Sequence, residues 1–150
     1  NGEQKVMLNG EDVSVEIRTP EASMAASDVS AVPEVRAFLF DLQRDIAKRN
    51  SCIMDGRDIG TVVLPQAQVK IFLTASPEIR AERRYKELIE KGSEVDYQSV
   101  LDDIVKRDYN DSHREIAPLK PAEDSVLFDT TGLALDESVA AITKIIKEKI

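Results

Sequence analysis

The sequence lacks most of what a secreted or membrane-spanning chain requires. It has a single cysteine, Cys52, and no tryptophan among its 150 residues, and one cysteine cannot form the paired disulfides of small secreted proteins. No apolar stretch approaches the roughly 20 residues of a membrane-spanning helix, and the first residues show no signal-peptide pattern. We therefore expect a cytoplasmic protein with no membrane partner.

Positive charge is also scarce. Twenty Lys and Arg residues stand against 28 Asp and Glu residues, which leaves a net charge of −8. Nucleic-acid binding depends largely on clustered Lys and Arg that neutralise backbone phosphates, so we expect no nucleic-acid partner. The hydrophobic share of 42% and the charged share of 32% are typical of one globular domain with a core.

Strands and helices alternate along the chain. Apolar and polar residues alternate over 4–17 around Asn9-Gly10, a pair typical of a tight hairpin turn because both residues take positive φ. Short apolar runs at 52–54, 69–74 and 125–129 are typical of buried parallel strands. Helices are expected after Thr19-Pro20, from Pro33, over 77–90, after Asp96 and at the end of the chain, on Val139, Ile142, Ile146 and Ile150. This order predicts an α/β fold, a three-layer arrangement around a parallel sheet with an antiparallel β-hairpin.

Arginine is distributed unevenly. All ten arginines lie before residue 115, and lysine supplies the positive charge of the last 36 residues. A guanidinium group matches phosphate or carboxylate with two parallel hydrogen bonds, which an ammonium cannot do. The segregation indicates an anionic substrate, although solvated ion pairs on an acidic surface are the alternative.

Two short motifs carry the strongest chemical signals. Arg107, Asp111 and Arg114 are spaced i, i+4, i+7 and share one helical face; a carboxylate between two guanidinium groups can accept sugar hydroxyls while its neighbours hold phosphate. A salt-bridge ladder is the alternative. Asp55 follows an apolar run, where a carboxylate can hold Mg²⁺ through water, although it can also cap a turn. Arg57 can reach a transferring phosphoryl group.

A third motif is the helix that carries Arg80, Arg83 and Arg84 and ends at Gly92. Several arginines on a mobile helical hairpin can close over a nucleoside triphosphate and neutralise its charge. The alternative is an ordinary surface helix, because Glu82 and Glu87 offer partners on the same helix.

Together these motifs resemble bacterial cytidylate (CMP) kinases over essentially the whole chain. The resemblance is carried by Asp55-Gly56-Arg57-Asp58-Ile59-Gly60-Thr61, by the 80–92 helix and by Arg107 through Ala117-Pro118-Leu119. It implies the P-loop nucleoside monophosphate kinase fold, with the hairpin as an insert. It further implies a CMP-binding insert subdomain at 1–28, a core at 29–79 and 93–150, and a lid at 80–92.

The resemblance also implies an activity and its residues. The reaction would be transfer of the ATP γ-phosphoryl group to CMP or dCMP, giving CDP or dCDP, with Mg²⁺. Ser27, Arg36 and Asp58 would read the cytosine edge. Asp111, steadied by Arg107, would hold the ribose, and Arg57 and Arg114 would hold the CMP phosphate. The catalytic set would be Arg57, Arg114 and Asp55, the last holding Mg²⁺ through water. Arg80, Arg83 and Arg84 would meet the ATP phosphates.

One departure from these kinases is large. Glycines stand only at 2, 10, 56, 60, 92 and 132, and no Gly-x-x-x-x-Gly-Lys-Ser/Thr phosphate loop exists. We therefore expect the C-terminal two-thirds of a kinase that is monomeric at full length, here without its first strand and phosphate loop and inactive alone. Because one edge of its sheet would be exposed, we expect the chain to be destabilised or aggregation-prone, or to pair with another copy through that edge. Two alternatives remain open: a non-catalytic CMP-binding module, and an α/β scaffold whose arginines only satisfy acidic neighbours.

Overall fold

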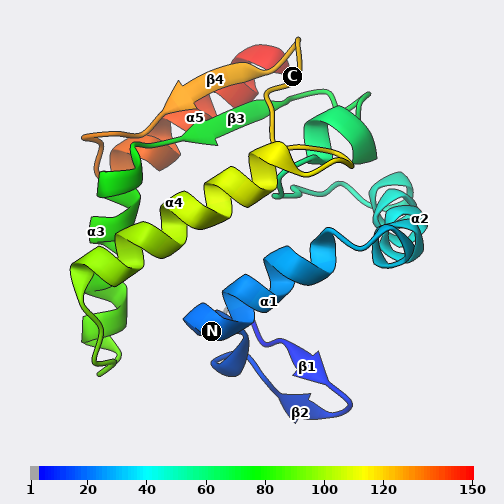
Figure 1. Cartoon of the computed structure of the whole chain (residues 1–150). Coiled ribbons are helices and arrows are strands. Elements are labelled where there is room, and N and C mark those ends of the chain that lie inside the picture. Colours follow the sequence, from blue (N-terminus) through cyan, green and yellow to red (C-terminus); the bar gives the residue numbers. More distant parts are fainter. Residues whose placement is uncertain (1–3) are drawn as a thin grey trace.

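The computed structural model describes residues 4–150, so the first three residues of the predicted 1–28 subdomain lie outside it (Figure 1). The strands are β1 (Met7–Leu8), β2 (Glu11–Asp12), β3 (Ile71–Thr74) and β4 (Val126–Asp129). The α-helices are α1 (Pro20–Ser30), α2 (Pro33–Arg49), α3 (Pro77–Glu90), α4 (Tyr97–His113) and α5 (Leu135–Lys149). Two shorter elements are the 3₁₀ helix η1 (Glu16–Arg18) and the π-helical turn η2 (Ile59–Val63).

The predicted hairpin turn is confirmed, but its second strand is shorter than expected. Asn9 and Gly10 both have positive φ, at 52° and 91°, and join β1 and β2 in an antiparallel pair. The strand expected to continue to residue 17 stops at Asp12. Ser14 donates to the Asp12 carboxylate at 2.6 Å and accepts from the Val6 amide at 2.9 Å, and this local bonding turns the backbone into η1.

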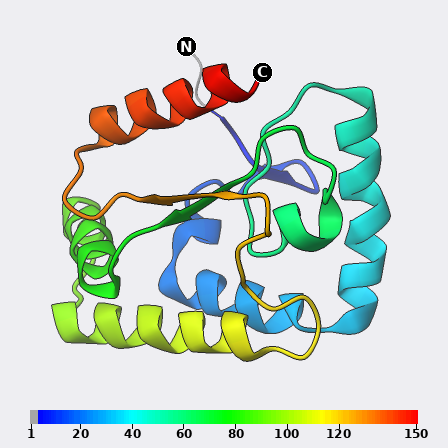
Figure 2. The same cartoon turned by 90° about the horizontal axis from the view of Figure 1, so that it is seen from above.

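The larger sheet consists of β3 and β4, which pair in parallel from Ile71 with Val126 to Thr74 with Asp129. Figure 2 shows α5 on one side of these strands and α3 and α4 on the other, which confirms the α/β arrangement in layers. The strand predicted at 52–54 is wrong: these residues have no regular secondary structure, and Ile53 is 93% exposed. An apolar run forms a strand only beside a ladder partner, and no described strand pairs with 52–54.

Helices α3 and α4 form a packed hairpin whose starts follow the predicted signals. The Ser76 hydroxyl accepts from the Ile79 amide at 3.3 Å, and the Asp96 carboxylate accepts from the Ser99 amide at 3.0 Å, so both helices have side-chain N-caps. Between the two helices, Ala81, Leu88 and Val100 form a buried cluster. This hairpin gives α4 a fixed position from which its C-terminal half can present side chains. None of the helices in residues 4–150 is long and apolar enough to cross a bilayer.

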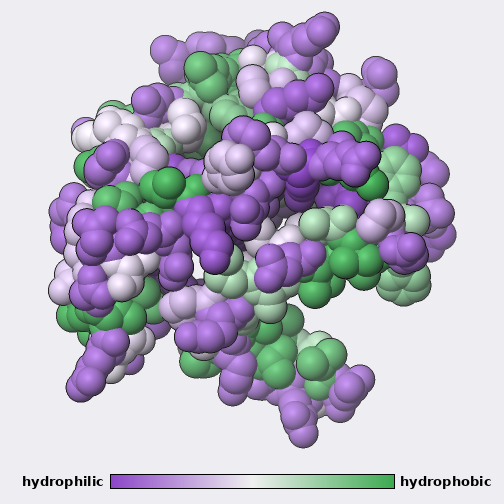
Figure 3. Space-filling model, viewed as in Figure 1, coloured by the Kyte–Doolittle hydropathy of each residue, from purple (hydrophilic) through white to green (hydrophobic). Residues whose placement is uncertain are grey.

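The chain leaves an unusual amount of its surface exposed. A compact folded chain of 16.7 kDa exposes about 7,600 Å², whereas this chain exposes 11008 Å². Large apolar side chains contribute, among them Phe38 at 77% exposure and Leu127 at 66%. Figure 3 shows apolar side chains on the surface around α2, and no residue of α2 is buried.

This exposed apolar surface predicts weak packing in the isolated chain. We expect strong enhancement of the fluorescence of the dye ANS and concentration-dependent association, because exposed apolar area drives both. We also expect a broad thermal transition, because little apolar surface is buried in a cooperative core. Calorimetry, ANS titration and light scattering test this together. A monomer with a sharp, cooperative transition and no dye enhancement would contradict it.

Candidate functional site

A cavity of about 460 Å³ lies where α1, α2, η2 and the C-terminal end of α4 meet. Its apolar lining includes Leu39, Phe40, Val62 and Ile116. Its polar lining brings together every residue that the sequence analysis linked to CMP: Ser27, Arg36, Arg57, Asp58, Arg107, Asp111 and Arg114. These seven residues come from segments far apart in the chain, so the fold alone assembles them.

Asp111 is the centre of one half of this cavity. It is 3% exposed, and its carboxylate accepts from the Ser27 hydroxyl of α1 at 3.2 Å and from Arg57 Nε at 3.0 Å. Arg107 Nε lies 3.9 Å from the same carboxylate, and Arg107 Nη1 donates to the Ser23 hydroxyl at 2.7 Å. Asp111 therefore ties α1, α4 and the 55–58 loop together.

Asp58 occupies the centre of the other half and is 8% exposed. Its carboxylate forms an ion pair with Arg36 of α2 and lies 3.6 Å from Arg114 Nη2. Arg36 also donates to the Ser30 carbonyl at 3.2 Å. A buried carboxylate is costly unless paired, and these two guanidinium groups pair Asp58, which lines the cavity.

The backbone on either side of the cavity takes special conformations. A Cβ at Gly56 would lie 2.8 Å from Ile59 Cγ1, so this loop needs glycine to approach η2. Beyond α4, Ala117 has a φ of 51°, which is uncommon for a residue with a side chain. In this conformation its carbonyl accepts from Arg114 Nε at 2.7 Å and holds the guanidinium toward the cavity.

The cavity carries excess positive charge. Its charged lining consists of four arginines and two aspartates, a net charge of +2. Burial lowers the pKa of Arg107, and repulsion from Arg57 lowers it further. Burial and then repulsion from Arg36 likewise lower the pKa of Arg114. Arg107 Nε and Arg114 Nη2 are buried without a hydrogen-bond partner among the described residues, and each faces a carboxylate beyond hydrogen-bond distance, Asp111 at 3.9 Å and Asp58 at 3.6 Å.

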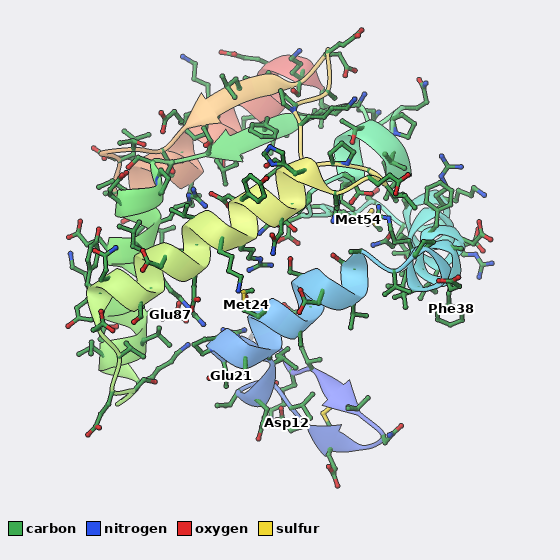
Figure 4. The ribbon with its side chains drawn as sticks, viewed as in Figure 1. Asp12, Glu21, Met24, Phe38, Met54 and Glu87 are labelled. Atoms are coloured by element: carbon green, nitrogen blue, oxygen red, sulfur yellow. The ribbon has the colours of Figure 1, made fainter. Side chains whose placement is uncertain are left out.

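A second, smaller cavity of about 240 Å³ lies between α1, α3 and α4. It shares Arg57 and Arg107 with the first cavity and adds Arg80 and Arg84. Arg80 Nη1 donates to Asp108 Oδ1 at 3.0 Å, and Arg80 Nη2 donates to the other oxygen of that carboxylate. Figure 4 shows Met24 in the space between α1 and α4, where it joins the apolar wall of this cavity.

The third arginine of this helix is directed elsewhere. Arg83 donates to the Thr130 carbonyl at 2.8 Å and to the Leu133 carbonyl at 3.1 Å, and it lines neither cavity. Arg83 therefore anchors α3 to the segment after β4 in this conformation.

Asp55 is separate from both cavities. Its side chain is exposed, and it lines neither of them. Within residues 4–150 no group of three or more His, Cys, Asp and Glu residues is placed to hold a metal ion. These residues do not form a magnesium cage, and a single exposed carboxylate suits only an ion that keeps most of its waters. The magnesium role of Asp55 remains a prediction.

Sequence reasoning missed three further polar residues of this region. Ser23 and Ser30, with Ser27, form a serine stripe on α1 at spacings of four and three, and this helical periodicity was a usable signal. Ser30 accepts from Arg114 Nη1 at 3.4 Å. Arg44 donates to the carbonyl of Val63 at 2.9 Å, and its spacing of eight from Arg36 indicates the same face of α2.

Comparison with known proteins identifies similar chains. The family model described as cytidylate kinase matches residues 1–148. The chain is 54% identical over 149 residues to a cytidylate kinase of Lactobacillus johnsonii, which covers 99% of this chain and 65% of that protein. It is 51% identical to a cytidylate kinase of Clostridium tetani, over 99% of this chain and 66% of that protein. The chain thus spans just under two thirds of the length of these curated relatives.

Proposed function

The chain belongs to the cytidylate kinase family, and we therefore propose that its larger cavity binds CMP or dCMP as the phosphoryl acceptor of an ATP-dependent nucleoside monophosphate kinase. One observation carries the proposal: the cavity has a net charge of +2 and its lining includes Arg114, whose Nη2 is a buried donor without a hydrogen-bond partner among residues 4–150. A phosphate monoester carries a charge of about −1.5 to −2 at pH 7 and three acceptor oxygens. It therefore offsets the positive charge of the cavity and offers acceptor oxygens to the Arg114 guanidinium group.

The base would be read by Asp58, Arg36 and Ser27. The exocyclic amine of cytosine is a hydrogen-bond donor, whereas uracil presents a carbonyl acceptor at the same position. The Asp58 carboxylate, which is fixed by Arg36, accepts from an amine and repels a carbonyl oxygen. The apolar side chains of Leu39 and Phe40 line the same cavity and offer a surface for the faces of the base.

The sugar and phosphate would lie deeper along the same wall. Asp111, steadied by Arg107, would accept from the ribose hydroxyls through the lone pairs that Ser27 and Arg57 leave free. Arg57 and Arg114 would hold the phosphate. The unpartnered Arg114 Nη2 supports this role. In domain terms, 1–28 would be the CMP-binding insert subdomain and 29–79 with 93–150 the core.

ATP, the phosphoryl donor, would bind in the smaller cavity. This cavity is lined by four arginines, Arg57, Arg80, Arg84 and Arg107, and their positive charge supports binding of the ATP phosphates. Residues 80–92 would close over ATP as a lid, and Arg83 would contact the phosphates on closure. The 150 residues contain no phosphate loop, so these arginines do not by themselves form a complete ATP site. Mg²⁺ would arrive with ATP and contact Asp55 through water, and its chemistry is neutralisation of the phosphate charge.

The proposed reaction is a direct displacement. An oxygen of the CMP phosphate forms a bond to the γ-phosphorus of ATP, the bond from that phosphorus to the bridging oxygen breaks, and the electron pair leaves with ADP as CDP forms. The chain contributes orientation and positive charge rather than a covalent intermediate. Arg57 suits the position between donor and acceptor because it lines both cavities. We propose that the full-length enzyme with this activity is a monomer in the cytoplasm, with no nucleic-acid or membrane partner.

Calorimetric titration with CMP, UMP and AMP tests the acceptor proposal. We expect CMP to bind more tightly than either of the others, and ATP to bind weakly. Cytidine serves as the matched control for the phosphate and should bind more weakly than CMP. Equal binding of all three monophosphates, or none, would remove the support for an acceptor site. Absence of binding would favour the scaffold hypothesis, in which the arginines only neutralise Asp58 and Asp111, whereas equal binding would leave a phosphate site without base selectivity.

A further inference from the structure

Arg44 attaches α2 to the turn that carries Asp58, although it lines neither cavity. Its Nε donates to the Val63 carbonyl at 2.9 Å and its Nη2 to the Val62 carbonyl at 3.4 Å. Its guanidinium carbon lies 4.2 Å from the centre of the Phe40 ring. Phe40 therefore supports one face of the guanidinium group while its edge bonds to the turn.

The Asp58 carbonyl holds the turn η2 together through hydrogen bonds. The Asp58 carbonyl accepts from the Val62 amide at 2.9 Å and from the Thr61 and Val63 amides at 3.3 Å. The carbonyls at the opposite end of η2 face Arg44, and a cation is favourable at the negative end of a helical turn. Because η2 is one short hydrogen-bonded unit, a shift at Val62 and Val63 moves the Asp58 backbone as well.

Helix α2 thus holds η2 at both ends. Arg36 pairs with the Asp58 carboxylate at one end, and Arg44 bonds to the last carbonyls at the other. Arg36, Phe40 and Arg44 are each four residues apart, so they share one face of the helix. Without Arg44, Arg36 and Arg114 would still hold the Asp58 carboxylate, but the opposite end of the turn would lose the two hydrogen bonds that attach it to α2.

We propose that Arg44 is a positioning residue that fixes the orientation of the Asp58 carboxylate and thereby sets the preference of the cavity for cytosine over uracil. This inference rests on the proposed function. It assigns base selectivity partly to a residue that touches no nucleotide.

The test compares R44M, which keeps the aliphatic length, with R44K, which keeps a donor that can reach one carbonyl. R49M is the matched control, because Arg49 lies on the same helix and is 79% exposed. We expect the ratio of CMP to UMP affinity to fall about tenfold in R44M, the size of coupling usual between contacting residues. R44K should restore part of the ratio, and R49M should leave it unchanged.

Two further measurements separate positioning from simple loss of stability. In the ligand-free chain, R44M should speed hydrogen exchange of the Thr61, Val62 and Val63 amides and leave the amides of α3 unchanged. In a D58A background, R44M should change the affinity ratio by less than about twofold, because the side chain through which Arg44 is proposed to act is then absent. A fall in melting temperature with an unchanged ratio, or unchanged exchange of the η2 amides, would overturn the inference. A wild-type chain without CMP preference would instead contradict the proposed function itself.

Discussion

Replacing Asp58 with alanine is expected to lower the CMP affinity of the chain by about 5- to 150-fold and to bring the CMP and UMP affinities close together. The range corresponds to the loss of about 1 to 3 kcal/mol when a buried polar group loses its partner. The CMP affinity falls because the exocyclic amine of cytosine loses its acceptor, and UMP affinity is spared because uracil presents a carbonyl oxygen at that position, which gains nothing from this carboxylate. Calorimetric titration of both nucleotides measures the ratio directly.

The conservative and control variants sharpen this experiment. D58N keeps one carbonyl acceptor and should give an intermediate ratio, because an amide can still accept from the cytosine amine but no longer pairs with Arg36 and Arg114 as an ion. D41A is the matched control, since Asp41 is an exposed aspartate on α2 away from the cavity lining. If D58A folds and keeps the wild-type ratio of CMP to UMP affinity, the base-reading role of Asp58 is wrong.

Replacing Arg114 with methionine should lower CMP affinity by about 10- to 150-fold while leaving cytidine affinity nearly unchanged. Hydrogen bonds to charged groups contribute about 1.5 to 3 kcal/mol, and Arg114 Nη2 is a buried donor with no described hydrogen-bond partner. Cytidine has no phosphate, so it does not use this donor. The quantity to measure is the ratio of CMP to cytidine affinity in wild type and variant.

Arg114 also has a structural role, which the same experiment must separate. Its side chain is 9% exposed and lies 3.6 Å from Asp58, so R114M is expected to lower the melting temperature as well. R114K keeps the charge and should retain much of the CMP affinity while losing the bond to the Ala117 carbonyl. If R114M lowers only the melting temperature and the ratio of CMP to cytidine affinity stays at its wild-type value, Arg114 does not bind the phosphate. That result would support the scaffold hypothesis.

Local sequence signals predicted the helices well because each signal lies within a few residues of the helix end or turn that it determines. Ser76 and Asp96 cap α3 and α4 through bonds to amides three residues ahead. Asn9-Gly10 turns the hairpin through its own dihedral angles. Such contacts need no tertiary structure, so they can be predicted from the local sequence.

The failures came where a residue depends on distant partners. The apolar side chains of residues 52–54 predicted a strand, but no described strand pairs with these residues. The second hairpin strand stops early because a serine two residues beyond Asp12 bonds back to it. The carbonyls to which Arg83 donates lie about 50 residues away in the sequence and gave no local signal either, and the contact of Arg83 with the ATP phosphates stays a prediction.

By itself, the sequence determined the family resemblance, the helices and the residue types of the cavity, because these rest on local bonding, periodicity and motif spacing. Only the tertiary structure decided that Ser27 meets Asp111 across 84 residues, that Arg114 retains a donor without a hydrogen-bond partner, and that Arg44 holds the turn behind Asp58. The physical reason is that burial and pairing depend on which segments pack together. Contacts between segments tens of residues apart in the sequence are not encoded in the local pattern of side chains around either partner.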